Sequence, residues 1–108
     1  MSDINKQKTA LHVIDFSSNL TEGYIKTFAY KVEEILKSMI TGNHSPVSVK
    51  GEEQKVKAFA RAIGNEERYI LALRDSKEDD PKTMAFRHEL ENSIADFEKT
   101  TGIKWPVR

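Results

Sequence analysis

The sequence predicts an α+β fold in which a strand, a long helix and a second strand precede a C-terminal antiparallel helical hairpin, so that the chain is mostly helical. Along most of the chain, apolar residues recur every three or four positions, which is the period of an amphipathic helix. Two short segments are instead rich in branched side chains, which favour strands. Clear helix start and stop signals near the C-terminus complete the prediction.

The composition indicates one domain, which we assign to residues 10–108 behind a polar tail at residues 1–9. Lys plus Arg and Asp plus Glu number 17 each, so no overall field attracts nucleic acid or an anionic membrane. The absence of Cys excludes disulfides, thiolate zinc sites and cysteine nucleophiles. We recognise no signal peptide and no membrane-spanning run, and therefore expect a cytoplasmic protein that does not bind membranes.

The first predicted strand spans residues 10–16, where branched and aromatic side chains are frequent. Both of its faces are mostly apolar, so we expect the strand to be covered on both sides. Asn19 followed by Glu22 resembles a capping box. The long amphipathic helix expected after it covers residues 20–41, and Gly42 ends it.

Residues 47–49 alternate between apolar and polar side chains and predict a short second strand. The order strand, helix, strand favours a parallel pair joined by a right-handed crossover. Two strands alone leave two unpaired edges, which makes the pair only marginally stable in water. We therefore expect further strands or oligomerisation to cover these edges.

The segment after the second strand leaves two alternatives open. Residues 52–63 have the apolar period of a helix, and Gly64 follows them. Gly64 can end this helix, with residues 69–73 forming a third strand. Alternatively, the helix continues to about Arg74, which is favoured because most residues from 66 to 74 are good helix formers.

The last helix has the clearest boundaries in the sequence. Asp80 can accept a hydrogen bond from the first turn, and Pro81 suits the first helical position. Gly102 can adopt the left-handed conformation that ends a helix, and Ile103 can then fold back on Phe97. The apolar stripe between the two ends consists of Phe86, Leu90, Ile94 and Phe97. Together, this helix and the preceding one are expected to form the C-terminal antiparallel hairpin.

The chemically reactive side chains do not form a catalytic or metal-binding set. His88 and Glu91 share a helix face, but a helical metal site needs further ligands from other helices. The acidic residues between 75 and 80 lack the glycine and the spacing of a calcium loop. No phosphate-binding, dinucleotide or nucleophile motif is present. We therefore expect no enzyme activity, no cofactor and no metal.

Two groups of side chains are candidates for binding. Trp105 either completes the core, which is favoured, or anchors a partner protein, and Tyr69 is a second aromatic candidate for such a contact. If the second predicted helix, which begins near residue 52, continues through Gly64, Lys57, Arg61 and Arg68 fall on one side of it. This stripe is a candidate nucleic-acid surface, although an acidic residue four positions before Lys57 favours an ion pair instead.

A resemblance rests on short segments spread over the second half of the chain. They are Ser48-Val49-Lys50-Gly51, Ala58-Phe59 with Gly64-Asn65-Glu66, Asp80-Pro81-Lys82-Thr83, and Asp96-Phe97-Glu98 with Thr101-Gly102-Ile103-Lys104-Trp105-Pro106. The pattern resembles small uncharacterised proteins encoded by tailed bacteriophages. The resemblance implies a phage accessory or virion protein, located in the host cytoplasm or the virion, and it carries over no catalytic residue.

The sequence as a whole therefore predicts a non-enzymatic interaction or structural module. Unpaired strand edges and broad apolar helix faces favour a homo-oligomer or a complex with another protein. The alternative is a nucleic-acid-binding accessory protein that uses the basic stripe of the second helix.

Overall fold

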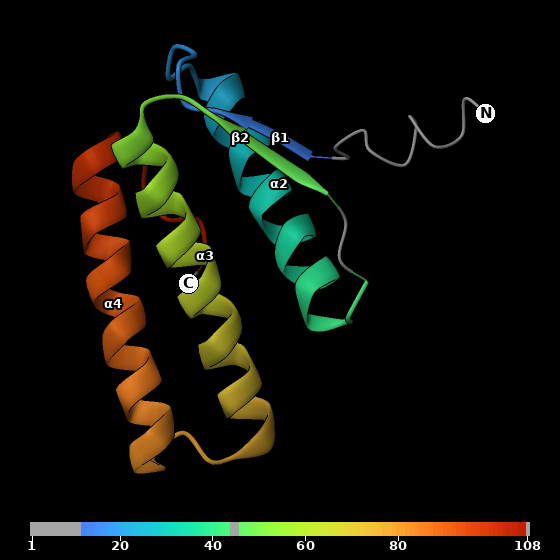
Figure 1. Ribbon diagram of the computed structural model, residues 1–108, viewed down its shortest axis with the longest axis vertical. Coiled ribbons are helices and arrows are strands. Elements are labelled where there is room, and N and C mark those ends of the chain that lie inside the picture. The colour runs from blue at the N-terminus through green and yellow to red at the C-terminus, as the bar shows by residue number, and fades with distance from the viewer. Residues whose placement is uncertain (1–11, 44–45, 108) are drawn as a thin grey trace.

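A computed structural model describes residues 12–43 and 46–107. The elements are, in order, β1 (His12–Asp15), α2 (Glu22–Ile40), β2 (Val47–Lys50), α3 (Glu53–Asp75) and α4 (Pro81–Thr101). The predicted mostly helical α+β fold is confirmed (Figure 1). The polar tail predicted at residues 1–9 and the first two residues of the predicted first strand lie outside the described residues.

The two strands form a parallel sheet in which Ile14 lies opposite Val49, and Val13 lies opposite Ser48. Because side chains alternate along a strand, Val13 and Ile14 point to opposite faces of the sheet. Ile14 is 1% exposed and belongs to the core, whereas Val13 is 38% exposed. The expectation of a strand covered on both sides is therefore wrong for the described part of the chain, where the core lies against one face only.

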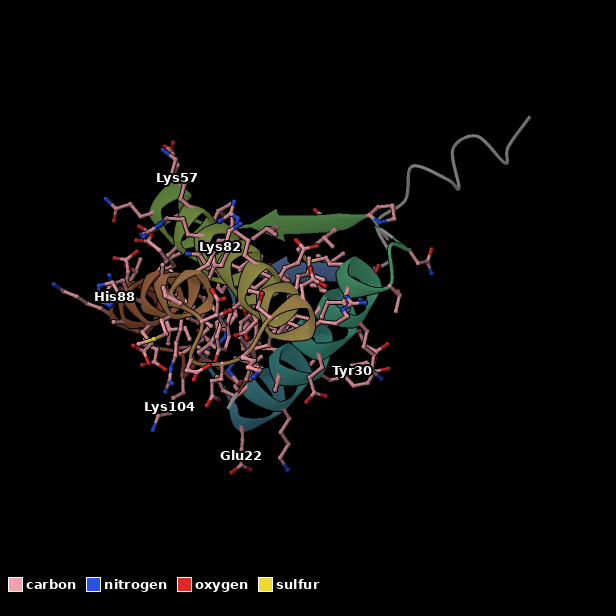
Figure 2. The ribbon with its side chains drawn as sticks, turned by 90° about the horizontal axis from the view of Figure 1, so that it is seen from below. Glu22, Tyr30, Lys57, Lys82, His88 and Lys104 are labelled. Carbon is pink, nitrogen blue, oxygen red and sulfur yellow. The ribbon has the colours of Figure 1, made fainter. Side chains whose placement is uncertain are left out.

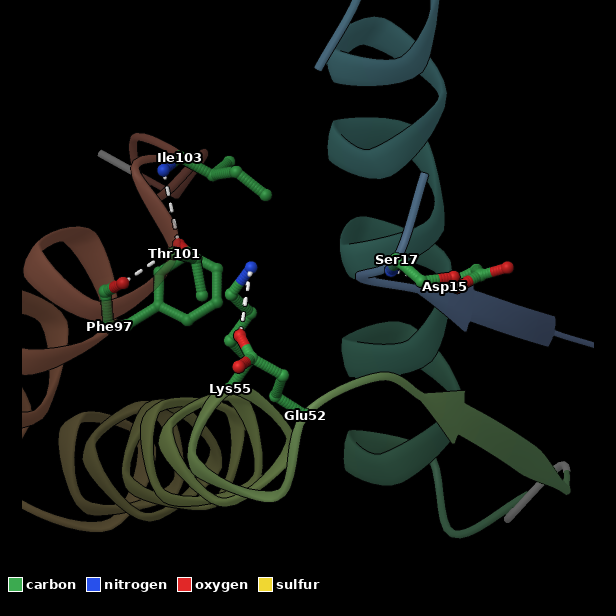
Figure 3. A network of polar contacts seen from close by, with 7 residues as sticks. All are labelled: Asp15, Ser17, Glu52, Lys55, Phe97, Thr101 and Ile103. Atoms are coloured by element: carbon green, nitrogen blue, oxygen red, sulfur yellow. Dashed lines mark hydrogen bonds and ion pairs between the residues drawn. The ribbon is translucent and has the colours of Figure 1, made fainter. Parts of the chain in front are cut away.

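Helix α2 is capped by Thr21, whose hydroxyl accepts the backbone N–H of Tyr24 at 3.1 Å. Asn19 lies in the connection that follows β1. There the Asp15 carboxylate accepts the N–H and the O–H of Ser17 in a local turn (Figure 3). Because Thr21 rather than Asn19 is the N-cap of α2, the predicted capping box is wrong.

Helix α3 runs without interruption from Glu53 to Asp75. The continuous helix that propensity favours is therefore confirmed, and the third strand at residues 69–73 does not form. Gly64 lies inside the helix rather than at its end. Helix α4 runs beside α3 in the opposite direction (Figure 1), and the Asn65 amide donates to the Ser93 hydroxyl across the pair at 3.1 Å.

Helix α4 has the boundaries that its sequence signals predict. The Asp80 carboxylate accepts a backbone N–H of the first turn at 2.9 Å, and Gly102 closes the helix with a φ of 74°. The Thr101 hydroxyl donates to the Phe97 carbonyl at 2.8 Å and accepts the N–H of Ile103 at 3.1 Å (Figure 3). These bonds turn the chain back over the helix, and Ile103 is buried as a result.

The centre of the core is a cluster of aromatic rings from the three helices and the segments that follow β1 and α4. Its members are Phe16, Phe28, Phe59, Phe97 and Trp105. The Phe97 ring stacks on Phe28 with a centroid distance of 5.8 Å, and it forms a T-shaped pair with Trp105 at a centroid distance of 5.1 Å. Aromatic pairs at these distances add attraction beyond their buried area, so this cluster joins α2, α3 and α4.

Candidate interaction site

Helix α2 covers the outer edge of β1. The N–H of Phe16 bonds to β2, so the backbone groups of Val13 and Asp15, which alternate with it, face away from β2. Lys31 donates to the Val13 carbonyl at 2.6 Å, and the Tyr24 hydroxyl donates to the Asp15 carbonyl at 2.7 Å. Both outward carbonyls of β1 therefore have partners on α2, and a further strand cannot add to this edge without breaking these bonds.

The pKa values of two side chains at this covered edge, Asp15 and Tyr24, are shifted in opposite directions. Hydrogen bonds from the side chain and the backbone of Ser17, with the nearby charge of Lys50, hold the pKa of Asp15 below its ordinary value of 3.8. Burial, with a smaller contribution from the negative charge of Asp15, raises the pKa of Tyr24 above 10.0. At neutral pH the Tyr24 hydroxyl therefore keeps the proton that it donates to the strand.

The outer edge of β2 has no comparable cover within the described part of the chain. The carbonyls of Pro46 and Lys50 accept the N–H groups of His12 and of Phe16, which directly follows β1, so the backbone groups of Val47 and Val49 face outward. Between residues 12–43 and 46–107, nothing bonds to these groups. Figure 2 shows β2 at the outside of the molecule, with β1 on its inner side.

An apolar groove with a volume of about 310 Å³ adjoins this open edge. Its walls come from the inner face of the sheet, from the second half of α2 and from the first half of α3. They consist of His12, Val47 and Val49, of Ile35, Ser38 and Met39, and of Phe59, Ala60 and Ile63. Val47 forms part of the rim and is 38% exposed. The open edge of β2 and this groove together are called the β2 surface.

The two aromatic residues predicted as partner contacts lie in the interior. Trp105 and Tyr69 are each 5% exposed. The Trp105 indole N–H donates to the Glu66 carboxylate at 2.9 Å, and its backbone N–H donates to Glu98 at 2.9 Å. These contacts fit the core alternative for Trp105, and neither ring is presented to a partner on the surface of this chain.

The basic stripe is largely neutralised by neighbouring groups. Lys57 lies 2.9 Å from the Glu53 carboxylate and points away from the molecule (Figure 2). Arg61 lies 3.5 Å from Asp96 on α4.

Arg68 donates to the Asn65 side-chain oxygen at 2.7 Å. Arg61 and Arg68 line one groove of about 370 Å³ beside Gly64, and this groove also contains the acidic residue Glu89. The structure therefore brings two of the three cations together, each with a polar partner, and leaves Lys57 one turn outside.

His88 and Glu91 do not act together in this structure. His88 is exposed and points outward (Figure 2), while Glu91 pairs with Arg87 at 3.3 Å. Among residues 12–43 and 46–107, no three His, Asp or Glu side chains gather where a metal ion could be held. Within the same ranges, no helix combines the length and the apolar character needed to cross a bilayer.

Two features of the structure were not predicted from sequence. Tyr24 and Lys31 are seven residues apart and share one face of α2, but sequence spacing does not say that this face meets the edge of β1. Glu66 is fully buried on the apolar side of α3. Its position three residues after Ile63 and three before Tyr69 was the available signal for that burial.

Comparisons of the chain with protein-family models, with curated proteins and with solved structures found no match. The geometry of the β2 surface is therefore the main basis for assigning a function to this chain.

Proposed function

We propose that this protein is a non-enzymatic interaction module that self-associates through the β2 surface. The observation that carries the proposal is the difference between the two strand edges. The carbonyls at the edge of β1 accept hydrogen bonds from α2, whereas the outward groups of Val47 and Val49 are open among the described residues. Proteins usually protect such an edge, because it is a template for pairing with another strand.

The apolar groove supports the same function. In strand addition, main-chain hydrogen bonds provide affinity, and pockets beside the edge provide specificity for alternate side chains. The groove adjoins the edge, and among the described residues that line it only His12 and Ser38 have polar side chains. A groove with this mostly apolar lining can bury apolar side chains of a partner but offers few groups for acid–base chemistry. The lining therefore supports a binding role without catalysis.

The biological setting that we propose is a phage accessory or virion protein, on the basis of the resemblance in the second half of the chain. The neighbouring genes test it. Capsid or tail genes on either side would indicate a virion component, and early genes would indicate a regulator directed at the host. A neighbourhood of bacterial metabolic genes would contradict the setting.

A matched pair of substitutions tests self-association. Val13 and Val47 are both valines of the sheet with 38% exposure, but only Val47 lies on the β2 surface. We expect the wild type and Val13→Lys to sediment as dimers at micromolar concentration. We expect Val47→Lys to sediment as a monomer with unchanged circular dichroism, because a charge at an open strand edge opposes pairing. A monomeric wild type would contradict the proposal.

A second candidate is nucleic-acid binding, because Arg61 and Arg68 line one groove. It predicts a mobility shift with DNA or RNA at low salt that weakens steeply as salt is added. Replacement of Lys57, Arg61 and Arg68 by Ala should abolish that shift. Unchanged mobility of the nucleic acid at low salt would exclude this candidate.

A further inference from the structure

The open edge of β2 has two residues whose backbone polar groups point outward. In a two-fold dimer, the same strand from each copy must pair antiparallel with itself. Residues that exchange both hydrogen bonds in an antiparallel pair lie directly opposite each other. Val47 and Val49 carry the outward groups, so each must face an outward residue of the other copy.

The position of the two-fold axis decides how many of these groups are paired. With the axis at Ser48, Val47 of each copy faces Val49 of the other, and all outward N–H and C=O groups of the strand find partners. With the axis at Val49, Val47 faces Gly51, which lies beyond the strand and has a φ of 130°. An axis at Val47 leaves Val49 opposite a residue before the strand. The Ser48 axis is the arrangement that pairs both valines inside the strand.

Charge favours the same axis. Lys50 is the charged residue of β2, and its neighbour in the register of the sheet is Asp15 of β1. With Ser48 on the axis, the two Lys50 residues are four positions apart along the paired strands, or about 14 Å at ~3.4 Å per residue. With Val49 on the axis the separation falls to about 7 Å, and like charges at that distance oppose pairing.

The side chains are compatible with this pairing on both faces. Val47 and Val49 line the apolar groove, so the valines of two copies would meet on the groove side of the joined sheet. Pairing would cover Val47, which is 38% exposed in the single chain. On the other face the small hydroxyl side chains of the two Ser48 residues would meet at the axis, where a cross-strand hydrogen bond between them is favourable.

We infer that the partner at the β2 surface is a second copy of this chain, paired antiparallel along β2 with Ser48 on the two-fold axis. The dimer then contains one continuous sheet in the order β1–β2–β2–β1. Both ends of that sheet are β1 edges whose carbonyls accept bonds from Lys31 and Tyr24, so association stops at the dimer. This inference deepens the proposed function and rests on it.

Single-cysteine variants test the position of the axis, because the natural chain has no Cys. Ser48 at the axis is a non-hydrogen-bonded pair, with Cα atoms about 4.5 Å apart, which is within disulfide range. Ser48→Cys should therefore form a covalent dimer under mild oxidation, visible on a non-reducing gel. Val49→Cys reports the alternative axis and should remain uncrosslinked. Lys50→Cys is the matched control, because it lies on the same face but about 14 Å from its counterpart.

Two double variants test whether the crosslink depends on the β2 surface. Adding Val47→Lys to Ser48→Cys should abolish the covalent dimer, whereas adding Val13→Lys should leave it. Circular dichroism of each variant checks that the fold is retained. Sedimentation of the reduced proteins shows whether each variant self-associates before oxidation.

The outcomes separate the inference from the function on which it rests. A dimer that crosslinks at position 48 and not at position 49 supports both. A dimer that crosslinks at position 49, or at neither position, overturns the Ser48 axis and leaves self-association standing. A monomer without crosslinks overturns both, whether the edge is then covered by residues 1–11 of the same chain or by a different protein.

Discussion

Gly51 and Gly64 are glycines with opposite structural requirements. Gly51 has a φ of 130°, and a Cβ atom added there would lie 2.8 Å from the Phe16 Cβ. Gly64 lies inside α3, and a Cβ atom added there would meet nothing within 4 Å. The connection between β2 and α3 therefore requires glycine, whereas α3 does not.

We predict that Gly64→Ala raises the free energy of unfolding by about 0.5–1 kcal/mol, because Ala restricts the unfolded chain and favours the helix. Gly51→Ala should lower it by about 1–3 kcal/mol through backbone strain and the contact with Phe16. Urea unfolding followed by circular dichroism measures both. Equal effects of the two substitutions would contradict the difference between the sites.

Glu66 is a fully buried carboxylate that accepts the indole N–H of Trp105 at 2.9 Å. A buried donor that loses its acceptor costs about 1–3 kcal/mol, so Glu66→Ala should destabilise the fold by at least that amount. Glu66→Gln keeps an oxygen acceptor and should cost less.

Trp105 is the only Trp, so its fluorescence reports this site directly. Glu89→Ala, at an exposed position of α4, is the control and should change neither stability nor emission. A Glu66→Gln variant that is as unstable as Glu66→Ala would contradict the importance of this hydrogen bond.

At the scale of elements, the contact between α2 and β1 makes the two strand edges unequal. Tyr24→Phe removes the bond to the Asp15 carbonyl and should lower the free energy of unfolding by about 1 kcal/mol. Tyr30→Phe on the same helix is the control, because Tyr30 is 62% exposed and points outward (Figure 2). Urea unfolding at neutral pH compares the two variants.

The raised pKa of Tyr24 also predicts a pH dependence. Above pH 10.0 the unfolded chain loses this proton while the folded chain keeps it, so stability falls as pH rises toward the folded pKa. The contribution is fully present below pH 10.0. Tyr24→Phe should therefore show a shallower alkaline loss of stability than Tyr30→Phe, and identical pH profiles would contradict the assignment.

At the scale of the whole molecule, dimerisation should couple stability to protein concentration. Mass action adds about 2.7 kcal/mol when a binding partner is at about a hundredfold above its dissociation constant. The Tm of the wild type and of Val13→Lys should therefore rise by several degrees over such a range. The Tm of Val47→Lys should stay constant. Calorimetric scans at several protein concentrations measure the Tm of each variant. A wild-type Tm that does not change with concentration would contradict dimerisation.

The order of elements and the limits of α4 could be predicted because the signals that produce them are local. Asp80 and Gly102 act on backbone groups within one turn, and the helix propensities of residues 66–74 outweigh the break suggested by Gly64. The start of α2 was misplaced because Asn19 and Thr21 are both residue types that cap helices, and the structure uses Thr21.

The sequence by itself determined the fold class, the strand–helix–strand order that favours a parallel pair, and the alternation of apolar and polar side chains at residues 47–49, because these follow from local periodicity and from the order of the elements. Only the tertiary structure decided that Lys31 and Tyr24 cover the edge of β1 while the edge of β2 stays open among the described residues. The physical reason is that a strand edge is covered by whatever packs beside it, and that depends on how α2 lies against the sheet.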